Sequence, residues 1–202
     1  MRATCQRCLR PDEYCVCRDL IAVTARTRVV ILQHPREARL AICSAWLARL
    51  SLVNAELHRG VRFEEGSPVR SLAASAGAAV LFPGDGSTPA EALAEAPPPV
   101  LFAVDGTWRQ AEKMLAQNAW LGALPRVAID AGRPSGYGAL RKEPGAVHLS
   151  TLEAIALALA ALERDPVRFD PMVKAFHRMV ELQLAASKGE RRSPRHRSYA
   201  AR

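Results

Sequence analysis

Four of the five cysteines lie close together near the N-terminus, in the pattern Cys5-x2-Cys8-x6-Cys15-x-Cys17. Zinc takes four soft ligands in a tetrahedron, and two closely spaced pairs deliver them from short loops. The polar, turn-forming spacer at 9–14 can bring both pairs onto one ion. The pattern predicts a structural zinc site, because the protein fills all four positions and leaves none for water. A redox pair is the alternative, since Cys5 and Cys8 alone would permit it.

The rest of the composition bears on where these thiols reside. Hydrophobic residues make up 49% of the 202 residues, but no run approaches the roughly 20 apolar residues of a membrane helix. Residues 1–5 carry no apolar stretch, so we expect no secretion signal and a cytoplasmic location, where thiols stay reduced. The fifth cysteine, Cys43, lies in an apolar helical pattern and is predicted to be a small buried hydrophobe.

A second candidate for chemistry is the run Asp105-Gly106-Thr107-Trp108, which directly follows five apolar residues at 100–104. A carboxylate at the end of a buried strand is held by rigid backbone, so Asp105 suits a general base, a ribose ligand or a cation partner. Alternatively, it bonds only the backbone of its own turn. Gly106 permits close approach to the backbone, and Trp108 either stacks on a base or packs in the core.

Basic residues cluster in two further places. The glycine-rich loop at 132–142 carries Arg133, Arg141 and Lys142 with a tyrosine, a composition that suits RNA phosphate and base contacts, although a solvated loop looks similar. Residues 187–202 hold six Lys or Arg against one Glu, within a net charge of +8. Such a tail is either a phosphate contact or a disordered, solvated segment.

The elements that must position these residues alternate along the chain. Short apolar runs predict strands at 28–32, 79–82, 100–104 and 126–130. Helices are predicted from 38 to about 50, 89 to 94, 107 to 118, 150 to 163 and 170 to 184, the third and fourth of which open with capping boxes. This order predicts an α/β fold with a parallel sheet covered on both faces.

In such a sheet, ligands bind beyond the carboxyl ends of the strands. The loops at 83–88, 105–108 and 133–151 meet there, and the His34-Pro35-Arg36-Glu37 run ends another strand. His34 is either a general base or a structural hydrogen bonder. The chain has no Walker loop and no Gly-x-Gly-x-x-Gly, which disfavours nucleotide hydrolysis and a Rossmann cofactor.

The chain resembles the DTW-domain proteins, the tRNA-uridine aminocarboxypropyltransferases, from Cys5 to about residue 184. One block departs, because the family often has a Gly-Thr or Asn-Thr pair where residues 40–44 read LAICS. The shared blocks are the cysteine pattern and residues 32–37 (LQHPRE), 81–84 (LFPG), 105–111 (DGTWRQA), 141–144 (RKEP) and 149–154 (LSTLEA).

The resemblance implies a relative of the SPOUT methyltransferases, with a knotted parallel sheet. Together with the cysteine spacing and the charge of the tail, it predicts a zinc-binding segment at 1–20, a SPOUT-like DTW catalytic domain at 21–186 and a basic, disordered tail at 187–202. It also implies S-adenosylmethionine as donor and tRNA as partner. The 3-amino-3-carboxypropyl group would pass to N3 of a uridine, and methylthioadenosine would be released.

Residue roles follow from the same resemblance. Asp105 is expected to be the catalytic base, because N3 of uridine is a poor nucleophile until its proton leaves. The residues expected to bind the donor are Phe82, Pro83, Gly84, Asp105, Gly106, Thr107, Trp108, Leu149, Ser150 and Thr151. Those expected to bind RNA are His34, Arg36, Arg133, Arg141 and Lys142. Two alternatives stay open, namely a SPOUT-type RNA methyltransferase and a non-catalytic zinc RNA-binding module.

Overall fold

A sheet of six parallel strands, in the order β2-β1-β5-β3-β6-β4, forms the centre of the molecule. The computed structural model describes residues 3–40, 42–74, 76–130, 135–136 and 149–188. The two longest strands, β1 and β5, lie side by side within the sheet. The strands are β1 (Arg28–Gln33), β2 (Ala55–Arg59), β3 (Ala79–Leu81), β4 (Thr88–Pro89), β5 (Val100–Asp105) and β6 (Arg126–Ala128).

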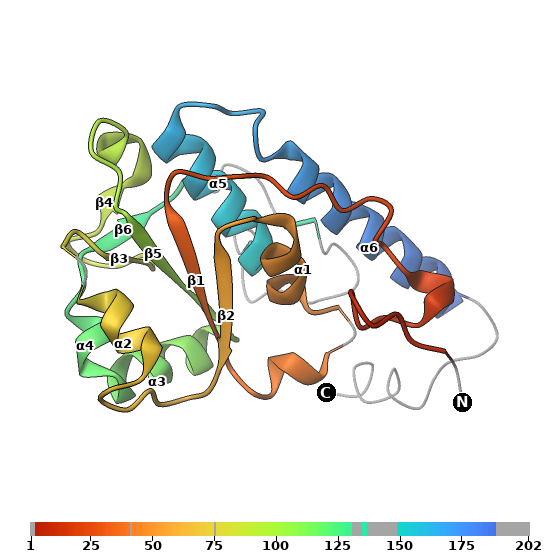
Figure 1. Cartoon of the computed structure of the whole chain (residues 1–202), viewed down its shortest axis with the longest axis horizontal. Coiled ribbons are helices and arrows are strands. Elements are labelled where there is room, and N and C mark those ends of the chain that lie inside the picture. Colours follow the sequence, from red (N-terminus) through yellow and green to blue (C-terminus); the bar gives the residue numbers. More distant parts are fainter. Residues whose placement is uncertain (1–2, 41, 75, 131–134, 137–148, 189–202) are drawn as a thin grey trace.

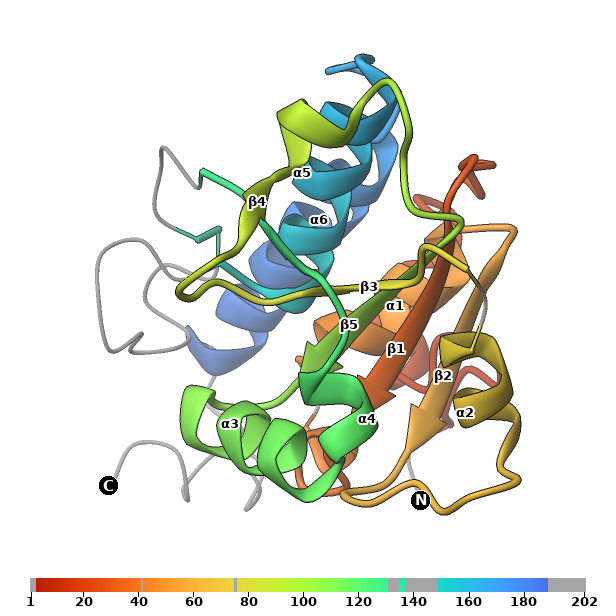
Figure 2. The same cartoon turned by 90° about the vertical axis from the view of Figure 1, so that its left-hand side faces the viewer.

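Helices cover both faces of this sheet (Figure 1, Figure 2). One face carries α1 (Ser44–Ser51) and α5 (Thr151–Glu163), with α6 (Asp170–Lys188) packed against both. The other face carries α2 (Pro68–Ala73), α3 (Trp108–Gln117) and α4 (Ala119–Gly122). Three short 3-10 helices complete the described elements: η1 (Asp12–Tyr14), η2 (Glu37–Arg39) and η3 (Ala90–Leu93).

Alternate side chains of β1 enter apolar cores on opposite faces of the sheet. In β1, Val29 and Ile31 pack toward α1, α5 and α6, whereas Val30 and Leu32 pack toward α2, α3 and α4. Both faces of the strand are therefore buried, which is why its sequence is continuously apolar. The same alternation places Gln33 at the end of β1 on the α1 and α5 face.

The predicted α/β architecture is confirmed, and the predicted elements agree with the structure in most places. Strands begin at 28, 79 and 100 as expected, and both predicted capping boxes are present at the starts of α3 and α5. The strand expected at 126–130 ends at Ala128. The helix expected near 89–94 is the 3-10 helix η3, and the last helix starts at Asp170 as predicted.

The helix expected from residue 38 was wrong at its start. Leu40 and Cys43 have extended backbone, so α1 begins only at Ser44, after the 3-10 helix η2. Sequence reasoning also missed β2, β4, α2 and α4. None of the helices in the described part of the chain has the length and apolar character needed to cross a membrane.

Candidate functional site

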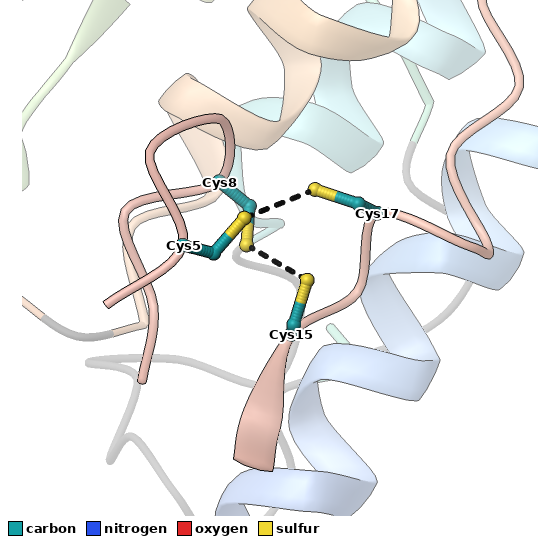
Figure 3. A group of neighbouring side chains, drawn as sticks. All are labelled: Cys5, Cys8, Cys15 and Cys17. Atoms are coloured by element: carbon teal, nitrogen blue, oxygen red, sulfur yellow. Dashed lines mark hydrogen bonds between the residues drawn. The ribbon is translucent and has the colours of Figure 1, made fainter. Parts of the chain in front are cut away.

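The four N-terminal cysteines converge on one point (Figure 3). Their Sγ atoms all lie within 4.8 Å of one another, with Cys5 and Cys17 3.6 Å apart and Cys8 and Cys15 3.7 Å apart. A tetrahedral zinc ion with Zn–S bonds of about 2.3 Å requires sulfurs about 3.8 Å apart. All five cysteines of the chain are free thiols. The cluster therefore has the donor set and the spacing of a structural metal site.

Two tight turns bring these cysteines together. Cys5 accepts a backbone hydrogen bond from Leu9 at 2.9 Å and donates one to Arg10 at 2.8 Å. Leu9 has φ of 60°, in the left-handed region that a non-glycine residue adopts at a cost of about 1–2 kcal/mol. The 3-10 helix η1 then turns the chain back toward Cys15. A metal bond to each pair would offset the cost of this conformation.

The electrostatics of the cluster also point to a cation. Backbone N–H groups of Cys8 and Arg7 lower the pKa of Cys5 to about 6. Burial, followed by the neighbouring thiols, raises the pKa of Cys17 to about 12. Four sulfurs at these distances cannot all ionise unless a positive charge lies between them. A divalent metal provides that charge and binds the thiolate form.

Residues 5–20, which carry the four cysteines and are called the metal segment below, are anchored to two helices. Arg10 is buried and donates from Nε to the Tyr14 carbonyl at 3.0 Å and from Nη2 to Gln183 Oε1 of α6 at 3.3 Å. The indole Nε1 of Trp46, on α1, donates to the carbonyl of Arg7 at 3.0 Å. Three side chains of the segment join the main core: Cys8, Val16 and Leu20. The cluster therefore fastens the N-terminus to α1 and α6.

Asp105 ends β5, and its side chain is only 6% exposed. Its Oδ2 accepts a hydrogen bond from Nε2 of Gln33 at 2.8 Å, and its Oδ1 accepts one from the hydroxyl of Thr151 at 2.6 Å. These partners come from β1 and from the first residue of α5. The Asp105 side chain therefore connects separate elements and does not bond only the backbone of its own turn.

Gln33 is fully buried and connects Asp105 to two further residues. Its Oε1 accepts from Nε of Arg59 at 3.2 Å, which fixes the orientation of the amide, and its Nε2 also lies 3.0 Å from Sγ of Cys43. Burial, and then the charge of Asp105, raise the pKa of the Cys43 thiol to about 11. Cys43 therefore stays a neutral thiol beside the site, on a half-buried side chain that the sequence predicted only as a core hydrophobe.

Sequence reasoning missed Gln33 and Arg59. Gln33 lies in the 32–37 block at the end of a predicted strand, and that position was the available signal. Arg59 gave no such signal, because β2 was not predicted. In the sheet, Gln33 is paired with Asp105 on one side and with Arg59 on the other.

The loops after β3 and β5 meet through their aromatic rings. Phe82 and Trp108 pack edge to face with centroids 5.6 Å apart, and the Arg126 guanidinium lies 5.8 Å from the Phe82 ring. Trp108 is 37% exposed, so it is a surface ring and its core-packing alternative is wrong. Gly84 has φ of 152°, and a Cβ there would lie 2.5 Å from Nη1 of Arg126. Phe82, Gly84 and Trp108 thus line one side of the strand ends, next to exposed Pro83.

The other residues that are expected to bind S-adenosylmethionine lie at the starts of α3 and α5. The Thr107 backbone N–H donates to Oε1 of Gln110 at 2.7 Å, and a Cβ on Gly106 would lie 3.0 Å from the Gln110 side chain. Ser150 is buried and caps α5, with half-buried Leu149 preceding it. The backbone at both starts is therefore held in a fixed conformation.

His34 and Arg36 follow β1 at the same edge of the sheet. The His34 Nδ1 accepts from the Arg36 backbone at 3.2 Å. Burial lowers the pKa of His34, and the nearby cations Arg36 and Lys113 lower it further. His34 is therefore held neutral within a positively charged neighbourhood. The predicted RNA contacts Arg133, Arg141 and Lys142 lie outside the described residues.

Glu153 ties the described part of the 131–148 segment to α5. It is 2% exposed, and its carboxylate accepts from the Ser150 N–H at 2.9 Å, the Gly136 N–H at 2.8 Å and the Ser135 hydroxyl at 2.6 Å. A Cβ on Gly136 would lie 2.6 Å from Nε2 of His177 and 3.2 Å from Oε1 of Glu153, so the backbone at Gly136 closely approaches both side chains. The carboxylate thus holds the backbone close to the Thr151 end of α5.

Replacing Glu153 with Gln is expected to lower the free energy of unfolding by about 2 kcal/mol, because a charge-assisted acceptor is lost and an amide donor faces other donors. Denaturant unfolding monitored by circular dichroism measures this change. Glu112→Gln, on the exposed side of α3, is the matched control and should change stability by less than about 0.5 kcal/mol. Equal stability of the two variants would contradict the anchoring role.

Comparison with known proteins identifies the family. The family model described as "DTW domain" matches residues 2–184. The chain belongs to the DTW-domain family. A Drosophila melanogaster relative named tRNA-uridine aminocarboxypropyltransferase 2 is 31% identical over 91% of this chain and 76% of its own length. The Macaca fascicularis protein of the same name is 29% identical over 91% of this chain and 64% of its own length.

A plant member extends the comparison. An Arabidopsis thaliana relative named tRNA-uridine aminocarboxypropyltransferase A is 28% identical over 90% of this chain and 81% of its own length. No solved structure matches the chain significantly. The DTW-domain match spans the cysteine cluster and every described strand, so the two sites above belong to one family unit. By name, these curated relatives of the DTW-domain chain are all transferases.

Proposed function

We propose that this DTW-domain protein transfers the 3-amino-3-carboxypropyl group from S-adenosylmethionine to N3 of a uridine in tRNA and releases methylthioadenosine. The DTW-domain match over residues 2–184 and the relatives named tRNA-uridine aminocarboxypropyltransferase support the proposal. The position of Asp105 supports it. This buried carboxylate accepts two hydrogen bonds and lies at the carboxyl end of the sheet, where α/β folds bind ligands.

The proposed reaction assigns Asp105 the role of general base. Its carboxylate takes the proton from N3 of uridine, and the N3 electron pair forms a bond to the γ-carbon of the donor's methionine portion. The bond from that carbon to sulfur breaks, and its electron pair stays on sulfur as neutral methylthioadenosine. Since the sulfonium is already a good leaving group, the protein mainly has to orient the two reactants.

The donor's adenosyl portion is proposed to lie along the backbone after β3 and β5 and at the start of α5. The contact between Phe82 and Trp108, which joins two of these loops, supports this placement. The proposed residues are Phe82, Pro83, Gly84, Asp105, Gly106, Thr107, Trp108, Leu149, Ser150 and Thr151. We also propose a SPOUT-like knotted topology. The chain path between β6 and α5, on which a knot depends, lies mostly outside the described residues.

The tRNA is proposed to bind over the same edge of the sheet. Arg36 and Lys113, next to the neutral His34, form a cationic neighbourhood there that suits phosphate. The target uridine must be accessible to the base, as in a loop of folded tRNA. The zinc ion is proposed to be held by Cys5, Cys8, Cys15 and Cys17 and to stabilise the fold without entering the reaction. Thiols kept reduced for zinc suit the cytoplasm, where we place the protein.

Thr151 is a positioning residue in this proposal, because its hydroxyl fixes one oxygen of Asp105. Thr151→Val keeps the shape of the side chain but removes the hydroxyl that donates to Asp105. We expect kcat to fall about 10- to 100-fold, which is the effect of a lost hydrogen bond to a charged group. Thr151→Ser restores the hydroxyl and should recover most of the rate. Single-turnover kinetics with saturating donor measure both variants. A Val variant as fast as the Ser variant would contradict the role.

The small-molecule product separates this reaction from methyl transfer. Chromatography of the reaction mixture should show methylthioadenosine formed in proportion to modified tRNA. S-adenosylhomocysteine in its place would identify an RNA methyltransferase. Binding of tRNA without binding of the donor would identify a non-catalytic zinc RNA-binding module.

A further inference from the structure

Arg59 ends the edge strand β2 with an exposed side chain that is held at two points. Its Nε donates to the buried Gln33 at 3.2 Å, and its guanidinium lies 5.8 Å from the centre of the Trp46 ring. Among the described residues, the Arg59 side chain has no other hydrogen bond and no ion pair, so its terminal nitrogens are paired with no carboxylate there. A fixed guanidinium with open terminal nitrogens is prepared to bind a planar anion.

Arg59 also lies in line with the proposed base. Arg59, Gln33 and Asp105 occupy one row across three neighbouring strands. The residues two and four positions earlier in these strands pack on the α1 and α5 face, so the three side chains share that face. The two hydrogen bonds on the Gln33 amide, at 2.8 and 3.2 Å, hold the guanidinium on the order of 8 Å from the carboxylate.

We propose that Arg59 binds the α-carboxylate of the donor's methionine portion, an inference that rests on the proposed function. In a reactive complex, N3 of uridine lies about 2.8 Å from Asp105, and the γ-carbon lies about 3–3.5 Å from N3 on the side from which the proton leaves, because the lone pair that held the proton forms the new bond. The donor's carboxylate carbon is three carbon–carbon bonds further, or about 4 Å. A hydrogen bond of about 3 Å from this carboxylate to a terminal nitrogen of Arg59 extends the reach to about 7 Å from the γ-carbon. The separation between Asp105 and Arg59, on the order of 8 Å, therefore lies within reach of an extended donor chain whose γ-carbon is next to Asp105.

The placement accounts for which group is transferred. With its carboxylate on Arg59, the donor's methionine chain spans the row above Gln33 and ends with its γ-carbon facing Asp105. The methyl group on the same sulfur then points away from N3. Arg59 thereby selects the carboxypropyl carbon over the methyl as the electrophile, since the reaction requires the carbon that lies in line with N3.

Isothermal titration of the full-length, metal-loaded protein with two ligands tests this assignment. S-adenosylmethionine carries the carboxylate, and methylthioadenosine lacks the whole carboxypropyl group. Arg59→Met should weaken binding of S-adenosylmethionine about 10- to 100-fold and leave binding of methylthioadenosine unchanged. Since the two affinities are compared in one preparation, their ratio does not depend on the fraction of folded protein. Arg62→Met, an exposed arginine three residues later, should leave the ratio unchanged.

Three results would overturn the assignment. An unchanged ratio of the two affinities in Arg59→Met excludes a contact with the carboxylate. A loss of tRNA affinity alone would assign Arg59 to the RNA backbone instead. In that case the slope of log affinity against log salt concentration should also fall by about one, as expected for one lost phosphate contact. Failure of the wild-type protein to bind S-adenosylmethionine would reject the proposed function together with this inference. The wild-type titration therefore separates the two failures.

Discussion

Asp105→Asn is expected to lower kcat by about 10²- to 10⁴-fold, the range over which a general base contributes. Asparagine keeps the size of the side chain and accepts the Thr151 hydroxyl bond, but it does not take the proton from N3. Donor affinity should change much less than kcat, because the proton transfer belongs to the transition state. Single-turnover kinetics together with donor titration measure the two effects separately.

A matched control for this variant lies at the far end of α5. Asp165 accepts a backbone hydrogen bond from Arg168, and Asp165→Asn makes the same chemical change outside the site. It should keep the wild-type rate. If Asp105→Asn retained more than about a tenth of the wild-type kcat, catalysis by this carboxylate would be excluded.

Cys8→Ser is expected to remove the metal and to lower the melting temperature by about 10 °C. Without the ion, the segment that carries Cys8, Val16 and Leu20 detaches from α1 and α6. Exposing two aliphatic side chains costs about 1.5–3 kcal/mol each, and each kcal/mol shifts the melting temperature of a chain of this size by about 2–4 °C. Elemental analysis and thermal unfolding measure zinc content and stability in the same sample.

Cys43→Ala provides the control for zinc content, because Cys43 lies outside the cluster. It should retain one zinc per chain. A chelator should reproduce the Cys8→Ser melting temperature in the wild-type protein. Absence of zinc from reduced wild-type protein, or the same stability with and without it, would reject the structural metal site and favour a redox role for the cysteines.

The metal segment and the proposed donor site are physically connected. Trp46 donates to the carbonyl of Arg7 in the cysteine turn, and the Arg59 guanidinium lies over the Trp46 ring. Arg59 is bonded in turn to Gln33 and, through it, to Asp105. Loss of the metal should therefore weaken donor binding as well as stability, although no ligand of the ion belongs to this network.

The sequence was sufficient for the features that depend on local pattern. The cysteine spacing predicted a cluster that the structure forms, and the apolar runs predicted β1, β3 and β5. The two capping boxes set the starts of α3 and α5 correctly, because a cap is decided by residues three apart in the chain. Asp105 was therefore placed correctly at the end of a strand.

The missing features depend on contacts between distant residues. The β2 residues 55–59 read Ala-Glu-Leu-His-Arg, and this edge strand lacks the apolar run of a central strand. Without β2, Arg59 could not be placed beside Gln33. Nor does sequence spacing reveal that Thr151 directs its hydroxyl to Asp105, 46 positions away. Residues that position the carboxylate are thus visible only in the folded chain.

Mass spectrometry of nucleosides from tRNA incubated with the protein and S-adenosylmethionine tests the central claim most directly. We expect one uridine to gain the mass of an aminocarboxypropyl group at N3, with an equal amount of methylthioadenosine, and the Asp105→Asn variant to give neither product. Unmodified uridine after incubation of zinc-loaded wild-type protein with unmodified tRNA would contradict the proposed transfer, as would a methyl mass in place of the carboxypropyl mass.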